Sequence, residues 1–186
     1  FLTRTPAVVF YDTENAKLQN LLTYPVATRV VAPRCYESWL PRNAIRYPGY
    51  HELSYLHPDR FTPDRNLALA NGLATEGDTF LIRTVAWNAN HDVGEQGWSP
   101  ELLRKLVSHL RAIGTVLISS EAPLPSDLEP NRYMGDPSHI HHLMAFCRMY
   151  IGESATMASE SAVLGVPAIY AATTGRGYTT EQENRF

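Results

Sequence analysis

Apolar runs alternate with helix-like segments through the second half of the chain, and this alternation is its most restrictive feature. Strands are expected at residues 79–83, 115–119, 149–151 and 167–170. A strong helix over 100–113, with Ser99 as its cap and one apolar face, separates the first two strands. Shorter helices are expected at 138–146 and 155–164. Strands that alternate with helices in this way favour an α/β fold with a doubly wound parallel sheet.

The beginning of the chain follows the same pattern over a shorter length. Residues 7–11 form a continuous apolar run, which is typical of a strand covered on both faces. A helix over about 16–22 follows, and either Asp12 or Thr13 is expected to cap it. Residues 26–31 are expected to form a second strand. This part therefore also predicts an α/β arrangement.

The middle of the chain separates these two regular parts. Residues 34–64 are rich in Pro, Tyr, Arg and His, and we expect irregular structure there with one helical turn near 52–56. Turn signals over 65–77 place a domain boundary nearby. The sequence begins at Phe1 without methionine and ends at Phe186 in a polar stretch. We therefore expect it to be the middle of a longer protein.

Charge and cysteine content exclude several classes of protein. The net charge of −3 over 186 residues argues against a basic nucleic-acid-binding domain. The two cysteines, Cys35 and Cys147, lie far apart and form no disulfide framework, which favours a reducing, cytoplasmic location. No apolar run approaches the ~20 residues that span a bilayer, and we expect neither a transmembrane segment nor a secretory leader.

Parallel sheets bind ligands at the carboxyl ends of their strands, and the segment after residue 151 has the composition of a phosphate site. Gly152 would allow a sharp turn, Ser154 would cap a helix, and the small Ala155 and Thr156 would leave their amides accessible. Glu160 lies about 9 Å further along the helix axis, within reach of a ribose diol. The alternative is an ordinary turn and cap, with Glu160 as an exposed helix carboxylate.

Residues 152–169, GESATMASESAVLGVPAI, resemble the nucleotide-binding segment of the GT-B superfamily. They are most similar to a little-characterised family related to UDP-N-acetylglucosamine 2-epimerases and glycosyltransferases. That family has a glycine turn, Thr-Met, a glutamate one turn on, and Leu-Gly-Val-Pro. Residues 12–14, 47–56 and 63–64 are also similar. One departure is Glu153, because many relatives have a second glycine after the turn, and a carboxylate beside a diphosphate is unfavourable unless it points away or meets an arginine.

The resemblance implies a GT-B-like protein with two Rossmann-like domains. Residues 1–67 would be the end of a truncated first domain, and 68–186 the second, nucleotide-sugar-binding domain. The implied activity is that of a glycosyltransferase or 2-epimerase-like enzyme in surface-glycan or polysaccharide synthesis. The implied partner is a UDP-sugar, with no further cofactor and no metal; the uridine is implied by the resemblance alone.

Other polar residues near the expected strand ends are candidates for the chemistry. Arg83 would pair with phosphate oxygens, or else form a surface ion pair. Asp12 and Glu14 would remove a proton from a sugar or an acceptor hydroxyl, or else be a helix cap and a solvated carboxylate. His91, beside Asp92, is a third catalytic candidate.

The last candidates are three histidines close together in the sequence, which could suggest a metal site. The spacing of His139, His141 and His142 does not place three metal ligands on one helix face, and no acidic or cysteine partner is adjacent. The functional alternatives are a non-catalytic sugar-nucleotide sensor and a structural α/β domain. The oligomeric state stays open, with a homodimer among the options.

Overall fold

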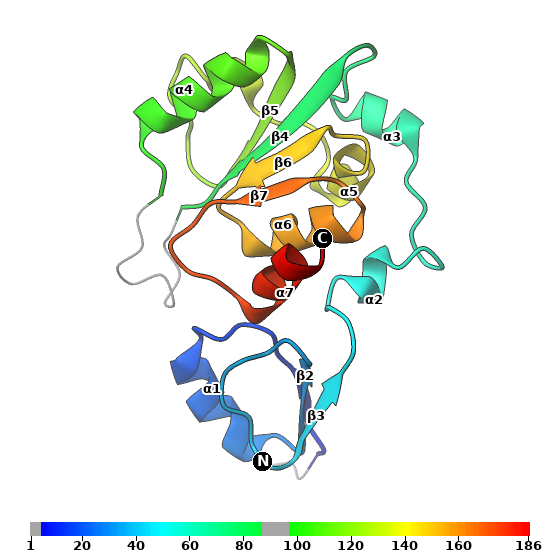
Figure 1. Ribbon diagram of the computed structural model, residues 1–186, viewed down its shortest axis with the longest axis vertical. Helices are drawn as coiled ribbons and strands as arrows, with labels where there is room; N and C mark the ends of the chain where they lie inside the picture. The colour runs from blue at the N-terminus through cyan, green and yellow to red at the C-terminus, as the bar shows by residue number, and fades with distance from the viewer. Residues whose placement is uncertain (1–4, 87–96) are drawn as a thin grey trace. The chain divides into compact units, whose positions relative to one another are not determined.

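The computed structural model describes residues 5–86 and 97–186, and the chain divides into two compact units (Figure 1). The first unit contains Phe1–Ser54 and Thr174–Phe186, and the second contains Tyr55–Thr173. Each unit has its own parallel β-sheet, so the predicted α/β class with parallel sheets is confirmed. The observed units differ from the expected split at 67/68 in two segments, 55–67 and 174–186.

The first unit is a three-stranded parallel sheet in the order β1-β2-β3. Helix α1 crosses from β1 to β2, and the side chains of Tyr24 and Val30 are buried in the core. The expected strand over 26–31 begins later because residues 24–26 form a 3-10 turn that contains a proline. The elements are β1 (Val8–Phe10), α1 (Lys17–Thr23), β2 (Arg29–Pro33) and β3 (Ala44–Tyr47).

Two expectations for the first unit are wrong. Neither Asp12 nor Thr13 caps α1, whose N-cap residue is Ala16, with no side-chain hydrogen bond. Strand β3 lies within the stretch expected to be irregular, because the pairing of Ala44–Tyr47 with β2 is a tertiary contact that its mixed sequence does not reveal. Helix α7 (Gly177–Arg185) was also missed, since its polar sequence has no apolar stripe to mark it.

The second unit is a four-stranded parallel sheet in the order β5-β4-β6-β7. Along β4, Phe80 and Ile82 pack with α4, whereas Leu81 packs with α3, α5 and α6 on the other face. Helices therefore cover both faces, as expected for a doubly wound sheet (Figure 1). The elements are α3 (Arg65–Ala70), β4 (Asp78–Thr84), α4 (Pro100–Arg111), β5 (Gly114–Ser120), α5 (Ile140–Met144), β6 (Met149–Gly152), α6 (Ala155–Val163) and β7 (Ala168–Tyr170).

Most elements of the second unit were predicted to within a few residues. Helix α3 was missed because it is short and precedes the turn signals, although Asp64 caps it by accepting two backbone amides. The expected helix over 138–146 is a 3-10 turn, Pro137–His139, followed by α5. The turn predicted near 52–56 is α2 (Leu53–Leu56), where the two units join.

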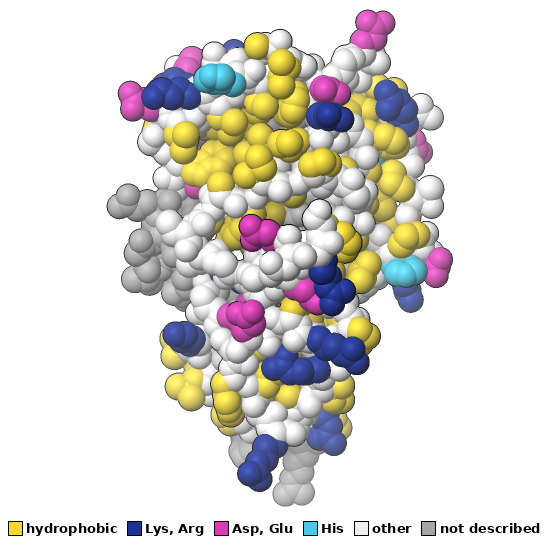
Figure 2. All heavy atoms as spheres, in the orientation of Figure 1, with side chains coloured by type: hydrophobic (Ala, Val, Ile, Leu, Met, Phe, Trp, Pro, Cys, Tyr) yellow, Lys and Arg dark blue, Asp and Glu magenta, His cyan; other side chains and the backbone are white. Residues whose placement is uncertain are grey.

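The distribution of charged side chains on the surface agrees with the net charge of −3. On the face that Figure 2 shows, acidic and basic side chains of the second unit are interspersed and form no basic stripe. Over residues 5–86 and 97–186, no helix is both long and apolar enough to cross a membrane.

Candidate functional site

A pocket of about 330 Å³ lies at the carboxyl edge of the second unit's sheet. Arg83 reaches it from the end of β4, Ser119 and Ser120 from the end of β5, and Met157 from the first turn of α6. Arg132, which follows a 3-10 turn after β5, also contributes to the polar lining. The pocket therefore stands where parallel α/β sheets bind their ligands, with two arginines on its wall.

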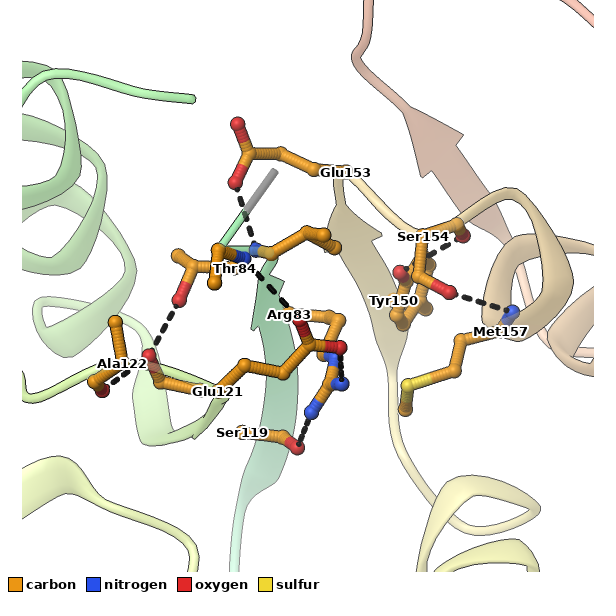
Figure 3. Close-up of polar contacts among 12 residues, drawn as sticks. Arg83, Thr84, Ser119, Glu121, Ala122, Tyr150, Glu153, Ser154 and Met157 are labelled. Carbon is orange, nitrogen blue, oxygen red and sulfur yellow. Dashed lines mark hydrogen bonds and ion pairs between the residues drawn. The ribbon is translucent and has the colours of Figure 1, made fainter. Parts of the chain in front are cut away.

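The Arg83 guanidinium is held in place by two side chains from the neighbouring strand end (Figure 3). One Nη donates to Ser119 Oγ at 2.8 Å, and the other forms an ion pair with Glu121. Glu121 also accepts the amide of Ala86 at 3.2 Å. Nε of Arg83 is buried and has no hydrogen-bond partner among the described residues. The predicted arginine thus borders the pocket, but a phosphate would share its charge with Glu121.

Arg132 is a pocket residue that the sequence did not reveal. Its Nε and one Nη each donate to the Glu129 carboxylate at 2.7 Å, which fixes the guanidinium at the pocket wall. No sequence pattern marks Arg132, because residues 121–139 contain no regular strand or α-helix. Arg132 is aligned with the sheet by a single parallel bridge to Ile118.

Gly152 serves a different purpose from the one expected. It ends β6 without a positive φ, so a left-handed turn is not its reason for being glycine. A Cβ at this position would lie 2.7 Å from the backbone oxygen of Arg83 and 2.6 Å from the Tyr150 hydroxyl. Gly152 therefore permits the close approach of β6 to β4 that places the start of α6 beside Arg83.

Helix α6 begins as predicted, with Ser154 as its cap. The Ser154 Oγ accepts the amide of Met157 at 3.3 Å. The first four amides of any α-helix lack partners within the helix, and Ser154 satisfies only one of them. Ala155 and Thr156 occupy the first two helical positions, so their amides and the helix dipole present partial positive charge at the strand ends.

Replacing Ser154 with alanine is expected to lower the free energy of unfolding by about 1 kcal/mol, because a capping hydrogen bond is lost. Ser154→Asp is the matched control, since aspartate caps equally well and its charge suits a helix N-terminus. Urea unfolding of the three proteins measures both effects. Equal losses in the alanine and aspartate variants would contradict the capping role.

Glu153 points away from Ser154 and the start of α6 (Figure 3). Its carboxylate accepts the amides of Val85 at 3.0 Å and Trp98 at 2.8 Å, and the side chain is buried. Glu153 thereby joins the backbone on either side of residues 87–96. The departure from the family pattern at this position adds no carboxylate to the mouth of the pocket.

Glu160 is buried, so its interpretation as an exposed helix carboxylate is wrong. Tyr55 donates its hydroxyl to Oε1 at 2.9 Å, and His141 Nε2 lies 2.9 Å from the same oxygen. Glu160 follows Met157 by three residues, which places the two on one side of α6, although only Met157 lines the pocket. Sequence patterns missed Tyr55 and His141, since both reach Glu160 through tertiary packing.

Asp12 and Glu14 both belong to the first unit and have separate partners. His51 Nδ1 donates to Asp12 Oδ2 at 2.8 Å. Burial is the largest influence on the pKa of Asp12 and would raise it, but the hydrogen bond and charge of His51, together with the hydrogen bond from Thr13, outweigh burial and the pKa is lowered. Glu14 Oε1 accepts the amide of Gly177 at 3.1 Å at the start of α7, and burial raises the pKa of Glu14. The alternative interpretation of Glu14 as a solvated carboxylate is therefore wrong.

Two further predictions concern His91 and the histidines at positions 139, 141 and 142. His91 and its neighbour Asp92 lie outside the described residues. Within residues 5–86 and 97–186, no three histidine, cysteine or acidic side chains are grouped so that they could hold a metal ion. His139, His141 and His142 instead pack with aromatic rings and with one another.

Comparison with known proteins identifies the family. A family profile described as "Protein of unknown function (DUF354)" matches residues 1–176. The chain belongs to the DUF354 family. An uncharacterised protein of Methanocaldococcus jannaschii, MJ0665, is 23% identical to this DUF354 chain over 173 residues, which covers 88% of the chain and 50% of the relative. The chain thus spans about half the length of that relative.

One solved structure is similar over most of the DUF354 chain. It is KpsC from Thermosulfurimonas dismutans, a beta Kdo 2,7 transferase, with 7% sequence identity over 90% of this chain and 79% of that one. The TM-score is 0.42, which is too low for the likeness to support a conclusion on fold or function. The similarity to 2-epimerases stays a prediction from residues 152–169.

Proposed function

We propose that the second unit of this DUF354 protein binds a nucleotide-activated sugar, with the diphosphate at the N-terminus of α6. The observation that carries the proposal is the pocket at the strand ends, where Arg83 and Arg132 lie beside the first turn of a capped helix. Free amides, a helix dipole and guanidinium groups are the combination that proteins use for phosphate. Glu160, one and a half turns further along α6, is the proposed acceptor for the ribose hydroxyls.

The proposed class follows from this ligand. We assign the protein to the GT-B-like sugar-nucleotide enzymes, of the glycosyltransferase or 2-epimerase type, with a UDP-sugar as the substrate. Support comes from the motif at residues 152–169 and from the position of Glu160 on α6, the helix whose first turn borders the pocket. The alternative, a structural α/β domain that binds no ligand, is also supported by an observation. Arg83 and Glu160 already have partners within the chain, as they would in such a domain.

Calorimetric titration of UDP and UDP-N-acetylglucosamine into the full-length protein tests the proposal. Glu160→Gln is the preferred variant because it keeps an acceptor for Tyr55 while removing the charge that would hold the ribose. We expect about a tenfold or greater increase in Kd for both ligands, which corresponds to losing a hydrogen bond to a charged group. Arg83→Gln should raise the Kd of both ligands in the same way, because each ligand carries the diphosphate.

Arg104→Gln is the matched control, because Arg104 lies on α4 and pairs with Asp127 on the surface. Its Kd values should equal those of the wild type. Failure of the folded wild-type protein to bind either ligand would overturn the nucleotide-sugar proposal. Binding that Glu160→Gln and Arg83→Gln leave unchanged would place the ligand elsewhere on the protein.

A further inference from the structure

Each of the two arginines on the wall of the second unit's pocket is already paired with a carboxylate. Arg83 forms an ion pair with Glu121, and Arg132 donates twice to Glu129. In both pairs a positive and a negative charge lie in contact, so their fields largely cancel at the pocket wall. A diphosphate that enters the pocket therefore meets two arginines whose charge is already compensated within the chain.

The two carboxylates differ in how firmly they are held. Glu129 accepts hydrogen bonds from Nε and one Nη of Arg132, both at 2.7 Å. Glu121 contacts Arg83 through one oxygen, and its other oxygen accepts the amide of Ala86 at 3.2 Å. An arginine–carboxylate pair with two parallel hydrogen bonds is stronger than a pair with one. Glu121 is therefore the carboxylate that an incoming anion displaces more easily.

The Glu121 side chain is also open to solvent. It is 44% exposed, whereas the side chain of Arg83 is 20% exposed. An ion pair at this exposure contributes little net free energy, because water solvates the carboxylate when the pair opens. Arg83 stays anchored by its 2.8 Å hydrogen bond to Ser119. Opening the pair thus costs little and frees a guanidinium that keeps its place at the pocket.

Arg83 lies between Glu121 and the start of α6. The sheet order β5-β4-β6 puts Glu121, after β5, on one side of Arg83 and Ser154, after β6, on the other (Figure 3). Arg83 and Gly152 are register partners, so the guanidinium and the free amides of α6 border the same strand ends. Nε of Arg83 is buried without a hydrogen-bond partner among the described residues, so the contacts around this arginine are incomplete. An anion at the start of α6 would compete with Glu121 for the same guanidinium.

We infer that Glu121 is an internal competitor of the ligand's diphosphate for Arg83. Glu121 holds the guanidinium in the free protein, and a bound diphosphate takes its place while Glu121 turns to solvent. The inference rests on the proposed function, in which the diphosphate lies at the N-terminus of α6. A diphosphate prevails because it carries more negative charge than one carboxylate and also meets the helix amides. The apparent affinity is lower than the intrinsic one, since only molecules with a free Arg83 are competent to bind.

Calorimetric titration of UDP and of inorganic pyrophosphate into the full-length protein tests the inference. Glu121→Gln removes the carboxylate charge but keeps an oxygen that can accept the Ala86 amide. We expect the Kd of both ligands to fall by about fivefold, because a partly exposed ion pair no longer has to be broken. A Kd that is unchanged or higher would overturn the inference, since a carboxylate that merely positions Arg83 would favour binding.

Asp127→Asn is the matched control, because it removes the same charge from a carboxylate that pairs with Arg104 outside the pocket lining. Its Kd values should equal those of the wild type, and a fall as large as that of Glu121→Gln would attribute the effect to net charge and overturn the inference. A double variant isolates Arg83. Adding Glu121→Gln to Arg83→Gln should leave the Kd of the Arg83→Gln protein unchanged, since the competitor has lost its arginine. A further fall in that background would equally overturn the inference.

A crystal structure of the full-length protein with UDP provides a measurement that needs no variant. The Glu121 carboxylate should lie apart from Arg83, whose guanidinium should contact the diphosphate. An intact pair of Arg83 and Glu121 beside bound UDP would overturn the inference and leave the binding proposal in place. Folded wild-type and Glu121→Gln proteins that bind neither UDP nor pyrophosphate would instead overturn the proposed function.

Discussion

Replacing Glu153 with alanine is expected to lower the free energy of unfolding by about 3–5 kcal/mol, because two hydrogen bonds to a charged group are lost together. Glu153 is only 3% exposed, and its two oxygens accept the amides of Val85 and Trp98. Alanine would leave both amides without their acceptor and would open a cavity at the end of β6. The loss should therefore exceed that of an ordinary surface carboxylate, which is usually within about 0.5 kcal/mol of zero.

Urea unfolding of the full-length protein, followed by tryptophan fluorescence, measures this effect. Glu153→Gln should lose less than the alanine variant, because an amide oxygen can still accept one of the two bonds. Glu101→Ala is the control, since Glu101 is an exposed carboxylate in the first turn of α4. A loss below about 1 kcal/mol for Glu153→Ala would show that the two bonds contribute little.

Replacing Gly177 with alanine is expected to detach α7 from the rest of the first unit. A Cβ on Gly177 would lie 1.9 Å from the backbone oxygen of Cys35 and 2.7 Å from Glu14 Oε1. The backbone oxygen cannot move aside without distorting the chain after β2, so the helix must shift. We expect a loss of at least about 2 kcal/mol, toward the upper part of the range for overpacking.

Hydrogen exchange of residues 177–185 in the full-length protein reports this detachment. Protection there should fall sharply in Gly177→Ala, whereas the sheet of the second unit should exchange as in the wild type. Gly175→Ala is the matched control, because the nearest atom to its Cβ would be Thr180 Oγ1 at 4.0 Å. Unchanged protection of α7 in Gly177→Ala would contradict the close packing at Cys35.

The regular part of the second unit was predictable because its signals are local. The caps at Ser99 and Ser154 and the apolar runs of β4 and β5 are written in a few adjacent residues. Strand β3 and helix α7 were not predictable, since pairing with β2 and packing against Cys35 are tertiary contacts. Propensity and pattern do not register contacts of that kind.

The same distinction applies to the candidate sites. Arg83 and Ser154 were found because each stands at the end of a recognisable strand or the start of a helix. The hydrogen bond between Tyr55 and Glu160 spans 105 residues in the sequence. His51 likewise meets Asp12 only because β1 and β3 flank the same strand. Partners at this separation become visible only in three dimensions.

The hydrogen bond between Glu14 and Gly177 has a consequence for synthesis on the ribosome. Because α7 belongs to the first unit, the chain leaves that unit after Ser54 and rejoins it at Thr174. The second unit is thus an insertion, and all of its strands and helices emerge before α7 does. Domains generally fold as units during synthesis, so the first unit cannot pack α7 until the second unit has been synthesised. Until residue 177 has been synthesised, Glu14 lacks the Gly177 amide that it accepts in the folded unit, whereas strands β4 to β7 of the second unit have already been synthesised.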